Sequence, residues 1–345
     1  MGDIILKMTG IDKRFSGVHA LKHVDFELRS GEVHALMGEN GAGKSTLMKV
    51  LCGIHSRDAG EIEYFGKPVN FANIAESQAA GISIIHQELN MMNHLTVAQN
   101  IYIGREPKKA GVYIDDRKME QDARNLFKKI GIHINPSVKL GTLTVGKQQM
   151  VEIAKAISYN SQVIVLDEPT SSLTEVEVEH LFRIINMLKA KGCGIIYISH
   201  KMEEILRISD EVTIMRDGTW VATRPAKELT MEEIIKLMVG RELTNRFPPK
   251  TNVPGEVILE VEHLAGKYPR LKDASFQLRK GEILGIAGLD GSGRTEVLEN
   301  LFGAMTKESG TIRLHGKEIK NKTPREAIKN GFALLTEERR ATGIF

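Results

Sequence analysis

This sequence of 345 residues is poor in the features that mark several classes of protein. Aromatic residues make up 5% of it, and its 47 basic residues nearly balance 44 acidic ones. It therefore lacks both the stacking surface and the basic excess of a nucleic-acid-binding protein, and we expect no nucleic-acid partner. Its apolar runs are no longer than buried strands, well short of the about 18 residues that a membrane span needs.

The N-terminus has no basic segment followed by an apolar one, so we expect no secretory leader. Cysteine is also scarce, and Cys52 and Cys193 lack the spacing of metal ligands or redox motifs. Both lie in apolar segments, and we interpret them as buried structural thiols in a reducing compartment. Together these absences predict a cytoplasmic protein whose contact with any membrane runs through a partner.

The chain repeats itself at an offset of 250 residues. Eight glycines recur at this offset, for example Gly38 as Gly288 and Gly81 as Gly331. The repeat predicts a first domain at 1–240, a Pro-rich linker at 241–255 and the N-terminal part of a second copy at 256–345. The second copy covers only the part of the first that ends near residue 95 (345 − 250 = 95). We expect either a truncated form of a longer subunit or a chain that works as a pair.

Short apolar runs alternate with helical patterns along the first domain. The runs 33–37, 162–167 and 194–199 have the length and branched composition of buried strands, whereas the apolar spacing within 178–188 is that of an amphipathic helix. This alternation predicts an α/β fold with a largely parallel sheet. Ligands are then expected at the carboxyl ends of the strands.

A glycine-rich loop follows the first of these strands. It reads Gly38-Glu39-Asn40-Gly41-Ala42-Gly43-Lys44-Ser45, with Thr46 next, and fits the pattern G-x-x-x-x-G-K-[ST] between a strand and a helix. Backbone N–H groups and the helix N-terminus of such a loop bind phosphates, the lysine reaches the β- and γ-phosphates, and the serine offers a hydroxyl to Mg²⁺. The loop therefore predicts a nucleoside triphosphate site with Mg²⁺. The alternative is a glycine-rich turn without a ligand.

Two carboxylates, Asp167 and Glu168, close the apolar strand at 163–166. One of them can hold Mg²⁺ while the next faces an attacking water. Taken alone, two acidic residues at this position can equally be a solvated strand end. The phosphate loop upstream favours the functional interpretation.

Four further segments, taken with these two motifs, resemble the ATP-binding cassette (ABC) family. Leu143-Thr144-Val145-Gly146-Lys147-Gln148-Gln149 is similar to its signature motif, with valine where most members have the first glycine, and Gly146 lies 21 residues before Asp167 (167 − 146 = 21). The other segments resemble the glutamine loop at Gln87, the loop after the second Walker motif at 171–174 and the switch histidine at His200. A lone histidine at a strand end is more often structural, but six motifs in the family's order favour the resemblance.

The resemblance implies a parallel-sheet core, an antiparallel β subdomain and a helical signature subdomain at about 89–160. It also implies that ATP is bound between the phosphate loop of one domain and the signature motif of another, so that Thr144, Val145 and Gly146 would serve the partner's nucleotide.

The family's catalytic roles would fall on Glu168 as the base for water, on His200 as the γ-phosphate sensor and on Gln87. Mg²⁺ would be held by Ser45, Gln87 and Asp167. Phe15 would stack on adenine, although a phenylalanine near a strand end is more often a core residue.

The second copy departs from the phosphate-loop pattern. It reads Gly288-Leu289-Asp290-Gly291-Ser292-Gly293-Arg294-Thr295, with arginine at the lysine position, and Glu337 replaces the glutamine. The planar fork of arginine cannot reproduce the compact ammonium between two phosphates. We therefore expect the nucleotide site at Arg294 and Thr295 to be hydrolytically weak.

Segments 238–241, 246–248, 255–261 and 335–340 resemble the tandem ATPase subunits of bacterial monosaccharide importers, with the galactose/methyl-galactoside type as the nearest. The implied partners are a transmembrane permease, a sugar-binding protein indirectly, and a second ABC domain or a second chain. The implied location is the cytoplasm, peripheral on the inner face of the cell membrane through the permease.

Two other functions fit parts of the sequence. A soluble tandem cassette of the ribosome-associated translation-factor type generally has a long charged helical linker, whereas this linker is short and rich in proline. A GTPase is disfavoured because the guanine-reading pattern Asn-Lys-x-Asp is missing: Asn321-Lys322-Thr323 is followed by Pro324.

Overall fold

The computed structural model describes residues 2–85, 91–109, 111–240, 249, 251–267, 271–289 and 291–336. The chain divides into two compact units, Met1–Thr244 and Asn245–Phe345. Most of the predicted linker lies outside the described residues.

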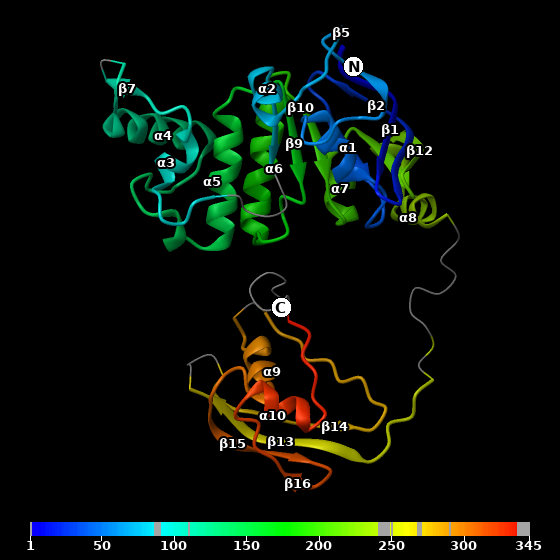
Figure 1. Ribbon diagram of the computed structural model, residues 1–345, viewed down its shortest axis with the longest axis vertical. Coiled ribbons are helices and arrows are strands. Elements are labelled where there is room, and N and C mark those ends of the chain that lie inside the picture. The colour runs from blue at the N-terminus through cyan, green and yellow to red at the C-terminus, as the bar shows by residue number, and fades with distance from the viewer. Residues whose placement is uncertain are drawn as a thin grey trace. The chain divides into compact units, whose positions relative to one another are not determined.

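A six-stranded sheet forms the core of the first unit (Figure 1). Its order is β12-β11-β3-β10-β9-β6, with β12 antiparallel at one edge and the other five strands parallel. The bounds are β3 Val33–Met37, β6 Ile82–Ile85, β9 Val163–Asp167, β10 Gly194–Ile198, β11 Glu211–Arg216 and β12 Thr219–Pro225. All residues of β3, β9 and β10 are buried, as expected for central strands covered on both faces. The predicted α/β fold is confirmed.

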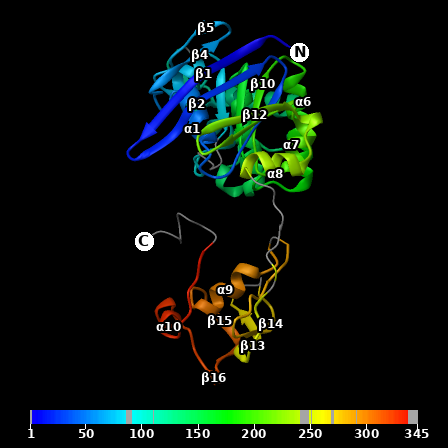
Figure 2. The same cartoon turned by 90° about the vertical axis from the view of Figure 1, so that its right-hand side faces the viewer.

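An antiparallel sheet covers one face of the core sheet. Its order is β2-β1-β4-β5, with bounds β1 Ile4–Phe15, β2 Val18–Arg29, β4 Ala59–Tyr64 and β5 Lys67–Pro68. Buried side chains of β1 and β2, such as Leu6 and Phe26, pack against Leu36 of β3 and Val165 of β9. Figure 2 shows these strands on one side of the core sheet and α6 and α7 on the other.

Helices flank the core sheet and extend it at one end. Those nearest the sheet are α1 Lys44–Leu51, α2 Ile74–Ala79, α6 Glu175–Lys189, α7 Met202–Ile208 and α8 Met231–Val239. At the end of the unit opposite β1 and β2 lie α3 Val97–Tyr102, the hairpin β7 Lys108–Lys109 and β8 Tyr113–Ile114, α4 Asp116–Ile130 and α5 Val145–Ile157 (Figure 1). Single turns of 3-10 helix occur at Leu140–Thr142 and Ala226–Glu228. The segment predicted as the signature subdomain therefore contains helices α3, α4 and α5.

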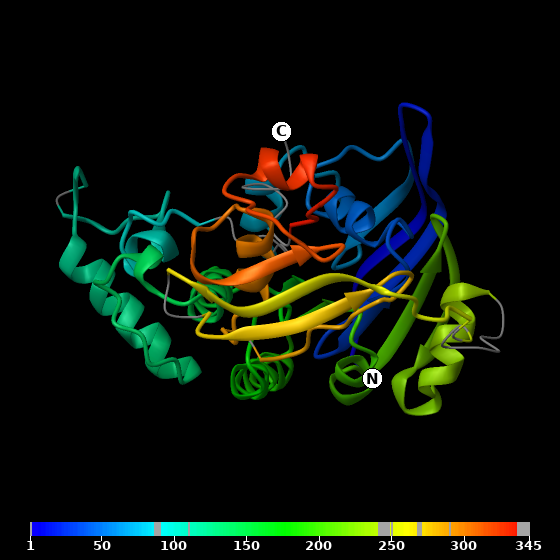
Figure 3. The same cartoon turned by 90° about the horizontal axis from the view of Figure 1, so that it is seen from below.

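The second unit repeats the first at the 250-residue offset. Its sheet has the order β14-β13-β15-β16, matching β2-β1-β4-β5. Its elements are β13 Val257–Gly266, β14 Ala274–Arg279, α9 Arg294–Phe302, β15 Lys307–Leu314, β16 Lys317–Glu318 and α10 Pro324–Lys329. Figure 3 shows α9 and α10 on one face of these strands. The helix after each phosphate loop begins 250 residues apart, at Lys44 and at Arg294 (294 − 44 = 250).

Residues 283–287, which correspond to β3, form no strand, and Ile283 is 93% exposed. In the first unit β3 pairs with β10 and β11, which begin at Gly194 and Glu211. The corresponding positions, 444 and 461 after adding 250, are beyond the sequence. Residues 257–329 of the second unit therefore correspond to the antiparallel sheet and its helices, and the counterparts of β10 and β11 would fall outside residues 1–345.

Both cysteines are buried, as predicted. Cys52 follows α1 and is fully covered, while Cys193 precedes β10 and is 5% exposed. Burial raises the pKa of each thiol to about 12.

Candidate active site

The phosphate loop lies at the carboxyl end of β3, at the edge of the sheet where an α/β fold binds its ligands. Its glycines are required by space and conformation. A Cβ on Gly38 would lie 2.4 Å from the Met215 carbonyl oxygen, and Gly43, the N-cap of α1, has φ 100°. The loop can thus present backbone N–H groups and the α1 N-terminus to an anion.

Lys44 is folded back into this loop. Its Nζ donates hydrogen bonds to the carbonyl oxygens of Gly38, at 2.7 Å, and Glu39, at 3.1 Å. The residue is buried, and desolvation lowers the pKa of the ammonium, while the nearby carboxylates of Asp167 and Glu168 oppose that shift. A cation is therefore held at the mouth of the loop at an energetic cost that a phosphate group would offset.

Ser45 and Asp167 come from different elements and meet beside the loop. The Ser45 hydroxyl donates to Oδ2 of Asp167 at 3.2 Å, across 122 residues of sequence. A hydroxyl and a carboxylate oxygen are the hard ligands that Mg²⁺ prefers. These two residues fit a Mg²⁺ ion that is shared with a phosphate.

Glu168 and His200 also converge from neighbouring strands. His200 Nε2 lies 2.5 Å from Glu168 Oε1, and the backbone N–H of Glu168 donates to the carbonyl of Ile198 at 2.8 Å. Glu168 has φ 51°, a left-handed conformation that few residues other than glycine adopt. Such backbone outliers gather at functional sites, and this one turns the carboxylate at the end of β9 toward the histidine that follows β10.

Glu204 on α7, which belongs to none of the sequence motifs, supports this pair. Its Oε2 accepts hydrogen bonds from the hydroxyls of Thr170 at 2.8 Å, Tyr197 at 2.9 Å and Ser199 at 3.3 Å. Burial raises the pKa of Tyr197, so its hydroxyl remains a donor. Lys201 adds an ion pair to Oε1 at 3.0 Å. This cluster ties the segment after Glu168 to both neighbours of His200, but it has no short sequence pattern.

The signature segment lies on the helical side of the unit. Thr144 caps α5. Val145, which stands where most family members have glycine, is 55% exposed, so there is room for its side chain. A Cβ on Gly146 would lie 2.6 Å from Oε2 of Glu177. That oxygen also accepts from the backbone N–H of Thr174, so glycine at 146 keeps the cap of α6 intact.

The remaining predicted site residues belong neither to the phosphate loop of the first unit nor to the signature segment, and some lie outside the described residues. Phe15 is outside the core at 41% exposure, and its ring packs edge-on against His55 with centroids 5.1 Å apart. Arg294 and Thr295 open helix α9 of the second unit, behind Gly293 at φ 95°. Gln87 and Glu337 lie outside the described residues.

The parallel sheet, the loop that cradles an anion and the two carboxylates define a phosphate-loop ATPase domain. The ABC transporter family model matches residues 21–171 and 271–343. The chain belongs to this family, and it binds nucleotide as an ABC-type ATPase.

The chain is 56% identical over 343 residues to the galactose/methyl galactoside import ATP-binding protein MglA of Mannheimia succiniciproducens, covering 99% of this chain and 68% of that protein. It is 55% identical to the Salmonella typhimurium protein of the same name, over 100% of this chain and 68% of the relative.

Among solved structures, a nucleotide-free ATP-binding cassette from an ABC transporter is similar with a TM-score of 0.60 and 26% identity, covering 69% of this chain and 96% of that one. The ADP conformation of the cassette MJ1267 is similar with a TM-score of 0.60 and 26% identity, covering 69% of this chain and 100% of that one.

Proposed function

We propose that this chain is the ATP-binding subunit of a bacterial galactose/methyl-galactoside importer and couples MgATP hydrolysis to movement of a transmembrane permease. The observation that carries the proposal is the likeness of 55–56% to import ATP-binding proteins over nearly the whole chain. The phosphate-loop geometry supplies the chemistry that such a role needs.

In the proposed mechanism, the loop N–H groups and Lys44 bind the phosphates of ATP, while Ser45 and Asp167 hold Mg²⁺. The ion, when bound, neutralises charge on the phosphates. Glu168 accepts a proton from the attacking water. The contact between Glu168 and His200 orients the carboxylate and places an imidazole beside it, and Phe15 offers a ring for the adenine.

We propose that the site is completed by a second domain. Thr144 and Gly146 lie at the N-terminus of α5, where backbone N–H groups can bind phosphate on a facing domain. In the second unit the equivalent of Gly146 would be residue 396 (146 + 250), which is beyond the sequence. A facing signature segment must therefore come from another chain or from a longer form of this one.

The proposed partners are the permease directly and a sugar-binding protein indirectly, with the chain peripheral on the inner face of the cell membrane. Across the part of the chain that the structure describes, no helix has the length and apolarity to cross a bilayer. Membrane attachment in this proposal is through the permease.

The test is reconstitution of the complete reading frame that encodes this chain with the permease from the neighbouring genes. ATP hydrolysis by the proteoliposomes is measured with the sugar-binding protein, with and without galactose or methyl galactoside. We expect the loaded binding protein to stimulate hydrolysis, and Glu168→Gln to remove it. Hydrolysis that is indifferent to the permease and the binding protein, with sedimentation of the protein on ribosomes, would favour the translation-factor alternative.

A further inference from the structure

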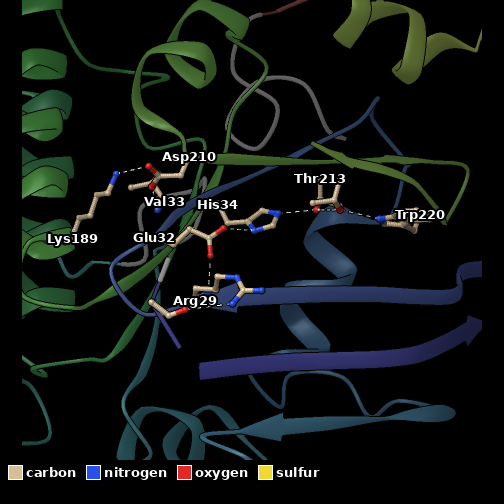
Figure 4. Close-up of polar contacts among 10 residues, drawn as sticks. Arg29, Glu32, Val33, His34, Lys189, Asp210, Thr213 and Trp220 are labelled. Atoms are coloured by element: carbon tan, nitrogen blue, oxygen red, sulfur yellow. Dashed lines mark hydrogen bonds and ion pairs between the residues drawn. The ribbon is translucent and has the colours of Figure 1, made fainter. Parts of the chain in front are cut away.

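Three ionisable side chains meet at the amino ends of the core strands, and the phosphate loop lies at the opposite, carboxyl ends. Glu32 and His34 flank the first residue of β3 (Figure 4). Glu211 is the first residue of β11, the strand beside it. One ligand atom from each lies within 4.8 Å of the other two. Because β3 leads from this cluster to the phosphate loop, its five residues separate the two sites by about 17 Å.

Two of these side chains are buried with unsatisfied polar atoms. Glu32 is 7% exposed and His34 is 2% exposed. Glu32 Oε1 and His34 Nδ1 are only 2.9 Å apart, yet neither has a hydrogen-bond partner of acceptable geometry among the described residues. Buried polar atoms of this kind are rare and call for a bound water or ion. Two ligand atoms about 2.0–2.1 Å from one tetrahedral ion are about 3.3 Å apart, so a bound ion would widen the separation of 2.9 Å by about 0.4 Å.

Comparison with the second copy of the fold shows which contact of Glu32 belongs to the turn and which is particular to the first copy. Oε2 of Glu32 accepts from the backbone N–H of Arg29 at 2.7 Å, and in the repeat Oε2 of Glu282 accepts from Arg279 at 2.8 Å. The turn before the strand thus uses Oε2 in both copies. The position of His34 is occupied by Leu284 in the repeat, so the imidazole is not needed for that turn.

The far side of the His34 ring is held as a metal-bound imidazole would be. Nε2 lies 2.7 Å from the Thr213 hydroxyl, which in turn lies 2.7 Å from that of Thr223. In the tautomer with its proton on Nε2, this nitrogen donates to Thr213 and the lone pair of Nδ1 is available to a cation. A partner on the second nitrogen is the usual arrangement around a histidine that ligates a metal.

The cluster is open to a pocket of about 250 Å³, which Glu32, His34 and Glu211 line together with Arg29. Asp25 and Glu27 also line it, but their carboxylates contact the Gly10 N–H at 2.7 Å and Lys7 at 3.7 Å. Asp210 is excluded as a ligand, since its oxygens accept from the Val33 N–H at 2.9 Å and from Lys189 at 2.6 Å (Figure 4). The pocket provides an entry path.

We propose that Glu32, His34 and Glu211 bind one divalent transition-metal cation of the Zn²⁺ type. One imidazole nitrogen with carboxylate oxygens is a ligand set suited to Zn²⁺, and solvent from the pocket completes the coordination. The cation links β11 to β3 and to the turn that precedes β3, so it stabilises the junction of the two strands. This site is independent of the nucleotide and of the proposed transport role.

The test is titration of ZnCl₂ into the metal-stripped, nucleotide-free protein by calorimetry. Trp220 is the single tryptophan, and its Nε1 donates to Thr223 at 3.0 Å, so its fluorescence reports on the same hydrogen-bonded chain. The variants are Glu211→Gln, which keeps the shape of a partly exposed side chain, and His34→Leu, which copies the repeat. Asp167→Asn is the control for zinc at the phosphate loop.

We expect one tight zinc per chain, a change in Trp220 fluorescence at the same stoichiometry and a higher melting temperature with zinc. Glu211→Gln and His34→Leu should each weaken binding at least tenfold, while Asp167→Asn should keep it. Thermal melts in the presence of a chelator establish that each variant is folded, and Glu211→Gln alone decides the matter if His34→Leu does not fold. Absence of tight zinc binding, or binding that Glu211→Gln leaves unchanged, would overturn the proposal.

Discussion

Oε1 of Glu168 and Nε2 of His200 lie 2.5 Å apart at the ends of two neighbouring parallel strands. The carboxylate is mostly buried, whereas the imidazole is half exposed. Because His200 faces solvent, a substitution of this histidine can remove its contact with Glu168, the base for water. This relationship makes the roles of the two residues separable by experiment.

Glu168→Gln should leave ATP binding close to that of the wild type, because the phosphates are held by the loop and Lys44. Hydrolysis should fall by about 10² to 10⁴, the usual contribution of a general base. Nucleotide binding by a fluorescent ATP analogue and phosphate release by the complete subunit measure the two quantities. Turnover at the wild-type rate in this variant would remove Glu168 from the catalytic role.

Lys44→Ala should abolish most nucleotide affinity, because it removes the buried ammonium that hydrogen-bonds the loop. Arg294→Ala should change steady-state hydrolysis much less, since the two loops are chemically unequal. Both variants are compared in the complete subunit by equilibrium binding and by ATPase rate. Equal losses from the two substitutions would contradict the asymmetry.

Gly146→Ala should fail to give the roughly 0.5–1 kcal/mol of stabilisation that alanine usually brings to a helix position occupied by glycine. The added Cβ displaces the Glu177 carboxylate and breaks the capping box of α6. Val145→Ala is the matched control, because an exposed position should change stability by less than about 0.5 kcal/mol. Urea unfolding followed by circular dichroism gives both values. A full gain of about 0.5–1 kcal/mol in Gly146→Ala would mean that Glu177 moves without loss.

The 345-residue chain should bind MgATP at Lys44 yet hydrolyse it slowly, since a facing signature segment is needed. Residual activity should rise faster than linearly with protein concentration while pairs remain mostly dissociated. ATPase rate is measured against concentration, with Glu168→Gln as the blank. Robust activity strictly proportional to concentration down to nanomolar levels, in a preparation shown to be monomeric, would rule out the shared site.

Cys52 and Cys193 should not react with iodoacetamide in the native protein at pH 8. Burial raises the pKa of both thiols to about 12, so the reactive thiolate is scarce, and burial also blocks access. Mass spectrometry after labelling in buffer and in urea should show labelling only in urea. Rapid native labelling of either cysteine would show that the strands or helices around it open readily.

Much of the fold could be predicted from local pattern. The run at 33–37 is β3 to the residue, and the runs at 162–167 and 194–199 each differ by one residue from β9 and β10. The helix after the phosphate loop begins at Lys44, because Gly43 in a left-handed conformation serves as its N-cap. Cap geometry of this kind depends on backbone dihedral angles that composition does not specify.

The candidate site was predicted as a set of motifs, and its assembly depended on topology. Ser45 and Asp167 are 122 residues apart in sequence, and they meet because β3 and β9 both pair with β10 in one parallel sheet. Glu204 could not have been predicted from a sequence motif. Its three hydroxyl partners come from a loop and from β10 and its end, so no fixed spacing marks it.

The phosphate loop, the order of the family motifs and the 250-residue repeat could be identified from residue type and spacing along the chain. Tertiary structure alone decided which distant groups touch: the pairing of Glu168 with His200, the limit that Glu177 places on Gly146, and the cluster of Glu32, His34 and Glu211. Strand order in the sheet brings these side chains together, and strand order results from the packing of whole elements rather than from any local pattern.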